Sequence, residues 1–216
     1  RRGGAGVRGA RPAAGAPQAD RGAQPSPAAR GPNAPLLTPS GLKPTTVPEM
    51  MAAMESQGID ESWTQDVPID DVDDRGGRYL RLTFARLASF PYDIDEVEEG
   101  LAKDPDNLID MIPPEVRELN GREVVVRGFM MPIDLREGES RRFMLVRNRL
   151  GCCFGMLLEL NEWMLVQMEP GTSVKWLNDV PISVYGRLEV GEDIHEGMVI
   201  SIYRMSGHDA EHHGGY

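Results

Sequence analysis

The chain has 216 residues, of which 40% are hydrophobic, 26% are charged and two are cysteines. Residues 1–30 carry six arginines against one aspartate, a charge of +5, so residues 31–216 carry −16 of the total charge of −11. This acidic balance counts against nucleic-acid binding, because such binding depends on Lys and Arg side chains that neutralise phosphates.

The N-terminal part is predicted to lie outside the folded core. Residues 1–45 are rich in Ala, Gly, Pro and Arg, and they bury too little apolar surface to offset the entropy of ordering. They are therefore expected to form a disordered arm. Residues 46–78 are predicted to form a short helix over Glu49–Gln57, which ends at Gly58, and then an acidic linker that includes Asp66–Asp74.

Residues 79–206 are predicted to form the folded domain, mainly from β-strands. The first strand is expected over residues 80–84, where Leu and Phe alternate with polar residues. The segment 91–103 is ambiguous and becomes helical toward its end, and one or two helical turns are expected after Pro113. Further strands are predicted at Glu123–Phe129, Arg142–Val146, Trp163–Met168, Ile182–Val190 and Met198–Met205.

The spacing of these strands favours a small barrel. Gly186 interrupts its strand and predicts a bulge or sharp bend. Gly191–Glu196 is predicted to be a hairpin loop, and residues 207–216 a flexible tail that contains histidines. Five or six short strands within roughly 130 residues are typical of a five-stranded OB-like β-barrel. A generic β-sandwich is the alternative.

Short motifs in the second half of the chain resemble one known family. They are Leu119-Asn120-Gly121-Arg122-Glu123-Val124, Arg127-Gly128-Phe129-Met130-Met131-Pro132, the Gly151–Gly155 cysteine motif, Asn161-Glu162-Trp163, Val184-Tyr185-Gly186-Arg187-Leu188 and Ile202-Tyr203-Arg204-Met205. Together they resemble an uncharacterised bacterial family, the domain of unknown function 3299. This resemblance implies an OB-like barrel in an exported or envelope-anchored protein, with no established activity.

The adjacent Cys152 and Cys153 are the candidate metal ligands. Neighbouring side chains of a strand point to opposite faces, so both thiolates reach one ion only if the backbone turns there, as the flanking Gly151 and Gly155 permit. Zinc requires two further ligands, copper(I) fewer, and the nearest candidates by type are His195, in the predicted hairpin loop, and His208, in the predicted tail. Some relatives in the resembled family have a histidine at the position of Gly155, and this departure counts against a metal site carried over from the family.

Two other interpretations of the cysteines stay open. Adjacent Cα atoms lie about 3.8 Å apart, below the usual range for bridged cysteines, so a disulfide between them is strained and easily reduced. Such a bond suits a thiol-redox switch. The structural alternative is that one cysteine packs in the core while the other lines a turn.

Aromatic residues predict a second kind of site. Trp163, Trp176 and Tyr185 suit the aromatic binding surface that OB-folds often carry, although Trp163 is assigned to barrel packing. Asn161, which belongs to one of the family motifs, is assigned with Trp176 and Tyr185 to a surface for a ligand or partner. No phosphate-binding Gly-rich loop, zincin helix or Gly-x-Ser-x-Gly elbow is present in the sequence, so no enzyme is predicted.

The leading hypothesis is a non-catalytic OB-like binding module of the bacterial periplasm or cell envelope, with a protein or a small ligand as its partner and without a cofactor. The alternative is a zinc- or copper-handling accessory protein of a transport system that uses Cys152 and Cys153. No apolar run reaches the roughly 18 residues that cross a bilayer, so membrane attachment is expected only through a segment upstream of Arg1.

Overall fold

The computed structural model describes residues 47–56, 58–59, 61–104, 108–149 and 158–213. Cys152, Cys153 and the arm predicted over residues 1–45 lie outside these ranges. The helices are α1 (Val47–Ser56), η2 (Glu61–Thr64), α2 (Phe84–Leu87), α3 (Ile94–Lys103), α4 (Pro114–Arg117) and η3 (Leu160–Glu162). The strands are β1 (Leu80–Leu82), β2 (Glu123–Pro132), β3 (Glu139–Ser140), β4 (Arg142–Val146), β5 (Trp163–Met168), β6 (Val174–Lys175), β7 (Pro181–His195) and β8 (Met198–His212).

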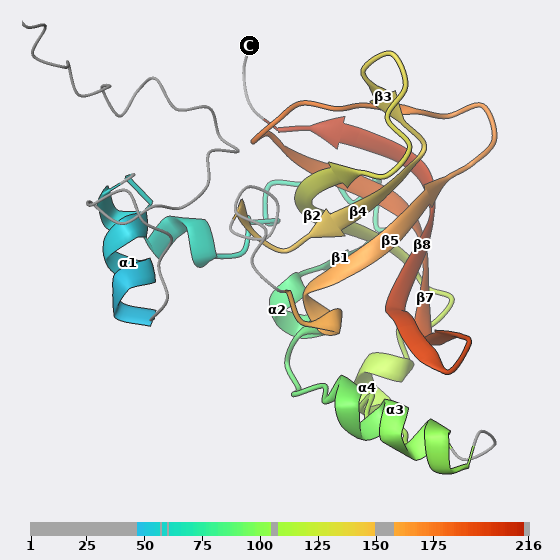
Figure 1. The fold of residues 1–216 in the computed structure, drawn as a ribbon. Helices are drawn as coiled ribbons and strands as arrows, with labels where there is room; N and C mark the ends of the chain where they lie inside the picture. The colour runs from blue at the N-terminus through green and yellow to red at the C-terminus, as the bar shows by residue number, and fades with distance from the viewer. Residues whose placement is uncertain (1–46, 57, 60, 105–107, 150–157, 214–216) are drawn as a thin grey trace, which may run out of the picture.

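The fold is mainly β and centres on a six-stranded mixed sheet, as Figure 1 shows. The strand order is β1-β2-β4-β5-β8-β7, and β7 pairs again with β2. β5 runs parallel to β8 and β1 parallel to β2, whereas the other pairs are antiparallel. β3 and β6 form a separate two-stranded ribbon at one end of the sheet.

β2 is the most deeply buried strand because it is covered on both faces. Val124 and Val126 face the main core, whereas Val125 belongs to a second apolar cluster on the other face. Burial on both faces explains why this strand is a continuous apolar run rather than an alternating one. Its N-terminal part pairs with β7 over residues 123–129, and its C-terminal part pairs with β4 over residues 129–132.

Helices α2, α3 and α4 lie at the end of the sheet opposite to β3 (Figure 1). The Thr83 side chain caps α2 by accepting from the Arg86 N–H at 3.2 Å, and Asp93 caps α3 in the same way. The apolar faces of these helices join the main core of the sheet. Within the part of the chain that the structure describes, no helix is both long and apolar enough to span a bilayer.

Residues 66–79, which include the predicted linker segment Asp66–Asp74, pack against the sheet instead of forming a linker. Ile69 and Val72 are buried with Tyr79 and Tyr185 in the second apolar cluster. Nearby, the buried Arg127 side chain of β2 donates to Asp71 Oδ1 at 2.7 Å. The segment is therefore part of the fold and covers the outer face of β2 and β7.

Three strand boundaries also differ from the prediction. The first strand ends at Leu82 because Thr83 caps a helix. The predicted hairpin loop is strand as far as His195, and the chain reverses at Glu196 and Gly197, which both have positive φ. The predicted flexible tail continues β8 as far as His212, because it pairs with the start of β7. The bulge predicted at Gly186 is confirmed by a register shift between Tyr185 and Gly186.

Candidate functional site

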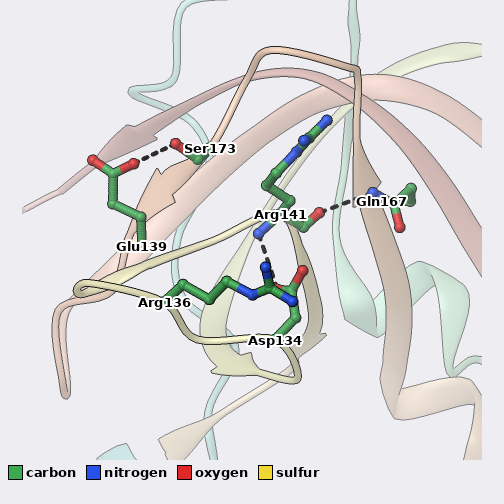
Figure 2. Close-up of a pocket in the computed structure, with 6 residues that line it drawn as sticks. All are labelled: Asp134, Arg136, Glu139, Arg141, Gln167 and Ser173. Atoms are coloured by element: carbon green, nitrogen blue, oxygen red, sulfur yellow. Dashed lines mark hydrogen bonds between the residues drawn. The ribbon is translucent and has the colours of Figure 1, made fainter.

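A pocket of about 440 Å³ lies at the end of the sheet that carries the β3–β6 ribbon. We call it the rim pocket. Figure 2 shows its lining, which comes from the β2–β4 connection, from β5 and from the segment before β6. The lining residues are Asp134, Arg136, Glu139, Arg141, Gln167 and Ser173.

The β2–β4 connection is held in place by its own backbone. Arg136 and Glu139 exchange two backbone hydrogen bonds of 2.8 and 2.9 Å around Glu137 and Gly138, which both have positive φ. Two consecutive residues of positive φ are typical of the tight turns that close two-residue hairpins. The Trp176 N–H then donates to Gly138 O at 2.8 Å, so the turn is tied to the ribbon partner.

Asp134 organises the base of this connection. Its Oδ1 atom accepts from Ser140 Oγ at 2.6 Å and from the backbone N–H groups of Arg141 and Arg142 at 3.1 and 2.9 Å. The hydrogen bond from Ser140 and those from the backbone lower the pKa of Asp134 to about 2. Asp134 is therefore ionised at neutral pH and acts as a fixed anchor for the loop.

The polar side chains of the rim pocket differ in whether they form hydrogen bonds or ion pairs. Glu139 accepts a hydrogen bond from the Ser173 hydroxyl, and the Gln167 amide donates to Met168 O at 3.2 Å. The guanidinium groups of Arg136 and Arg141, in contrast, make no hydrogen bond or ion pair with any described residue. The pocket therefore contains two guanidinium groups whose donors have no partner among the described residues.

We expect Asp134→Ala to loosen the rim pocket. The variant removes the acceptor of two backbone N–H groups, so exchange of the Arg141 and Arg142 amide hydrogens should become roughly tenfold faster. Hydrogen exchange followed by mass spectrometry or NMR measures this. Asp70→Ala, which removes an exposed carboxylate elsewhere, is the control. Equal exchange rates in the two variants would show that Asp134 does not hold the loop.

The same anchor predicts a pH dependence. The folded pKa of Asp134, about 2, lies below its ordinary value of 3.8, so its stabilisation is complete above about pH 4 and is lost as pH falls through 2. Protection of the Arg141 and Arg142 amides, corrected for intrinsic exchange, should therefore be constant from pH 7 to pH 4 and fall near pH 2. A fall centred between pH 5 and pH 6 would contradict this assignment.

The predicted surface residue Trp176 lines a different, smaller pocket of about 140 Å³. This pocket also contacts the C-terminal part of β2 and residues 177–180. Beside it, the Arg149 guanidinium pairs with Asp179 at 2.9 Å and lies 5.5 Å from the centre of the Phe129 ring. Trp176 is half-buried and packs against the main core, so only part of its ring is accessible.

Tyr185 and Asn161, predicted on the same surface, are buried instead. The Tyr185 ring is covered by Arg75, whose guanidinium carbon lies 3.9 Å from the ring centre, and its hydroxyl donates to Asp73 O at 3.1 Å. Asn161 Nδ2 donates to Phe90 O at 2.6 Å. Both are corrected to structural residues, because segments distant in the sequence cover them.

Of the candidate metal ligands, only His195 and His208 lie in the part of the chain that the structure describes. His195 lies at the exposed tip of the β7–β8 hairpin, paired in register with Met198. Cys152 and Cys153 fall in the undescribed range 150–157, so their metal-binding role stays a prediction. Among the residues with described positions, no group of three His, Cys, Asp or Glu side chains is suited to hold a metal ion.

A buried polar cluster lies at the helical end of the fold. The Glu192 side chain is only 2% exposed, and its Oε2 atom pairs with Arg117 Nη2 at 3.4 Å. The Tyr92 hydroxyl is buried, and burial together with the nearby Glu192 carboxylate raises the pKa of Tyr92, so this tyrosine stays neutral. This cluster holds the helices on the hairpin and is separate from the rim pocket.

The rim arginines were not predicted from the sequence, which indicates residues 134–140 only as a polar connection between strands. The local signal in this connection is Gly138, since glycine favours tight turns. Asp134 and Ser140 flank the turn, and both residue types often hydrogen-bond to nearby backbone. Exposed arginines are common on protein surfaces, so Arg136 and Arg141 carry no signal until their pocket is seen.

Comparison with solved structures found a similarity, whereas no protein-family model and no curated protein matches the chain. The chain is similar to a crystal structure of a DUF3299 family protein from Pseudomonas aeruginosa PAO1, with 20% sequence identity and a TM-score of 0.42. The match covers 64% of this chain and 98% of that chain. The family of the matched protein is the one that the motifs between Leu119 and Met205 resemble.

Proposed function

We propose that this chain is an OB-like binding module of the bacterial cell envelope, that it holds a protein partner or a small ligand, and that it has no catalytic activity. The strand pairings support an OB-like barrel. They run β2-β4-β5-β8-β7 and return to β2, and the one parallel pair of this ring is β5 with β8, its third and fifth strands in chain order. A five-stranded, partly open barrel with Greek-key connections is the architecture of OB-folds.

The observation that carries the binding role is the rim pocket. In OB-folds, the connection between the first two barrel strands is one of the two loops that contact ligands. The corresponding connection here is that between β2 and β4, and it supplies four of the six pocket residues. It is also anchored by Asp134, so the pocket is formed before a ligand arrives. The envelope location is supported by the family resemblance of the motifs.

Site-specific photocrosslinking tests this proposal in bacteria that produce the full chain. Leu135 lies between the lining residues Asp134 and Arg136 and is 44% exposed, so we expect a benzophenone side chain at this position to reach a ligand bound at the rim. We expect Leu135→p-benzoylphenylalanine to give a discrete covalent adduct after irradiation. Intact-mass spectrometry of the purified protein detects adducts of either a protein or a small ligand.

The matched control is the same substitution at Met198. This residue is 52% exposed and lies at the hairpin tip, away from the β3–β6 ribbon. We expect no discrete adduct there. Adducts at Met198 and none at Leu135 would move the binding surface to the hairpin, and an absence of discrete adducts at both positions would contradict the proposed function.

A further inference from the structure

We propose that the rim pocket recognises an oxyanion, a carboxylate or phosphate group on a ligand with an apolar portion, through Arg136 and Arg141. This inference rests on the proposed binding role of the rim and names the chemistry of its ligand. It comes from the two guanidinium groups of the pocket, which have no partner among the described residues.

The two carboxylates of the pocket balance the charge of its arginines, but neither forms an ion pair with them in the part of the chain that the structure describes. Asp134 already accepts three hydrogen bonds at one oxygen, and Glu139 accepts one from Ser173. Each guanidinium has five N–H donors and no acceptor. Because neither guanidinium has a partner among the described residues, the donors of both are left for a ligand.

The two guanidinium groups approach the pocket from different directions. Figure 2 shows the Arg141 side chain pointing away from Asp134, although its backbone N–H donates to that residue. The Arg136 side chain extends from the tight turn, and its guanidinium overlaps the Asp134 carboxylate in this view. A group that binds between them can receive donors from two sides. The backbone that carries both side chains is already fixed, which reduces the entropy lost on binding.

Guanidinium geometry selects the class of ligand. Its planar, forked donors match the two oxygens of a carboxylate or a phosphate, and such charge-assisted bonds are roughly twice as strong as neutral ones. The chain as a whole carries −11, which repels extended polyanions. At physiological salt, however, charges more than about 8 Å away are largely screened, so a compact oxyanion is affected mainly by the pocket itself, where two arginines offset two carboxylates.

The flanking residues indicate the apolar portion of the ligand. Ile133 and Leu135 lie on either side of Asp134 and are 45% and 44% exposed. They are two of the five large hydrophobic side chains of the described chain that are exposed. Neither side chain lines the pocket itself, so an apolar group that extends beyond the pocket is needed to cover them, and their burial contributes about 25 cal/mol for each Å² removed from water.

Titration of the full-length ¹⁵N-labelled protein with four probes tests this inference. The probes are hexyl phosphate, hexanoate, hexylamine and hexanol, which share the apolar chain and differ in the head group. We expect hexyl phosphate, hexanoate or both to shift the amide signals of residues 134–142 and 173–175 in a saturable manner. The tighter of the two identifies the oxyanion, and hexylamine and hexanol should bind at least tenfold more weakly.

Variants separate recognition by the arginines from general adsorption. Arg136→Gln and Arg141→Gln should each weaken binding about tenfold, and the double variant should show no saturation. Arg86→Gln, which removes a positive charge from α2 at the other end of the sheet, is the control and should bind normally. The unchanged spectrum outside the rim shows that each variant is folded.

Two results would overturn the inference. The first is saturable binding that persists in the double variant or is equally tight with hexylamine. The second is no saturable shift at the rim with either oxyanion. If Leu135 then still forms its photocrosslink, the binding role of the rim stands and only its preference for oxyanions is wrong.

Discussion

Replacing Gly186 with alanine is expected to lower the free energy of unfolding by about 3 kcal/mol, at the upper end of the usual cost of overpacking. Gly186 pairs with Val124 of β2 on one side and with Gly207 of β8 on the other, at the bulge of β7. A Cβ atom at this position would lie 2.3 Å from Ser206 O and 3.0 Å from Gly207 Cα. Both contacts are to backbone, so rotation of a side chain cannot relieve them.

Urea unfolding of the two proteins measures this effect, and Gly171→Ala is the matched control. Gly171 has φ of 91°, and a Cβ atom there would have nothing within 4 Å, so alanine carries only the cost of a left-handed backbone, about 1 kcal/mol. If Gly186→Ala is no more destabilising than the control, β7 does not approach β8 this closely. The bulge of β7 against β8 would then be misplaced.

Arg117→Gln is expected to cost about 3 kcal/mol of stability for a different reason. It leaves the Glu192 carboxylate, which is only 2% exposed, without its cationic partner. Removing one member of a buried pair is strongly destabilising because the remaining charge is neither solvated nor paired. The Arg117 side chain is itself one-third exposed, which places the expected cost at the lower end of the range for such pairs.

A double-mutant cycle isolates this interaction. Glu192→Gln in the Arg117→Gln background removes the unpaired charge, so it should restore most of the lost stability and give a coupling energy of about 2 kcal/mol. Urea unfolding of the four proteins supplies the cycle. A coupling energy below about 0.5 kcal/mol would mean that Arg117 stabilises the fold through Asp110 and packing rather than through Glu192.

The interior strands could be predicted from the sequence because their patterns are local. β4 and β5 have the predicted bounds, Arg142–Val146 and Trp163–Met168, since each is a short apolar run between polar connections. The bulge at Gly186 was also predictable, because a glycine inside an alternating strand often marks a bulge or the close approach of another backbone. These features depend only on residues a few positions apart.

The errors occur where distant segments decide the structure. The β7–β8 hairpin extends to His195 through polar residues, because the buried Glu192 is paired by Arg117 from α4. Tyr185 is buried because residues 66–79 cover it, and no pattern near Tyr185 indicates that cover. A two-residue period predicts which face a side chain takes, but not which segment lies on that face.

The candidate site was only partly within reach of the sequence for the same reason. Trp176 does line a pocket, but not the one with unused donors. The rim pocket requires the β3–β6 ribbon, which brings residues 139–140 beside residues 174–175. Each of these strands has two residues, too few for a detectable period, so their pairing is visible only in three dimensions.

The rim pocket is proposed to present Arg136 and Arg141 to a ligand. Asp134 holds the loop of this pocket, and the sheet that carries it is completed by the pairing of β7 with β2. A crystal structure of the full chain grown with hexyl phosphate tests this most directly. It should show β7 hydrogen-bonded to β2 along residues 123–129 and the phosphate within hydrogen-bonding distance of both guanidinium groups. A phosphate bound elsewhere, such as beside Trp176, or a sheet open between β2 and β7, would contradict it.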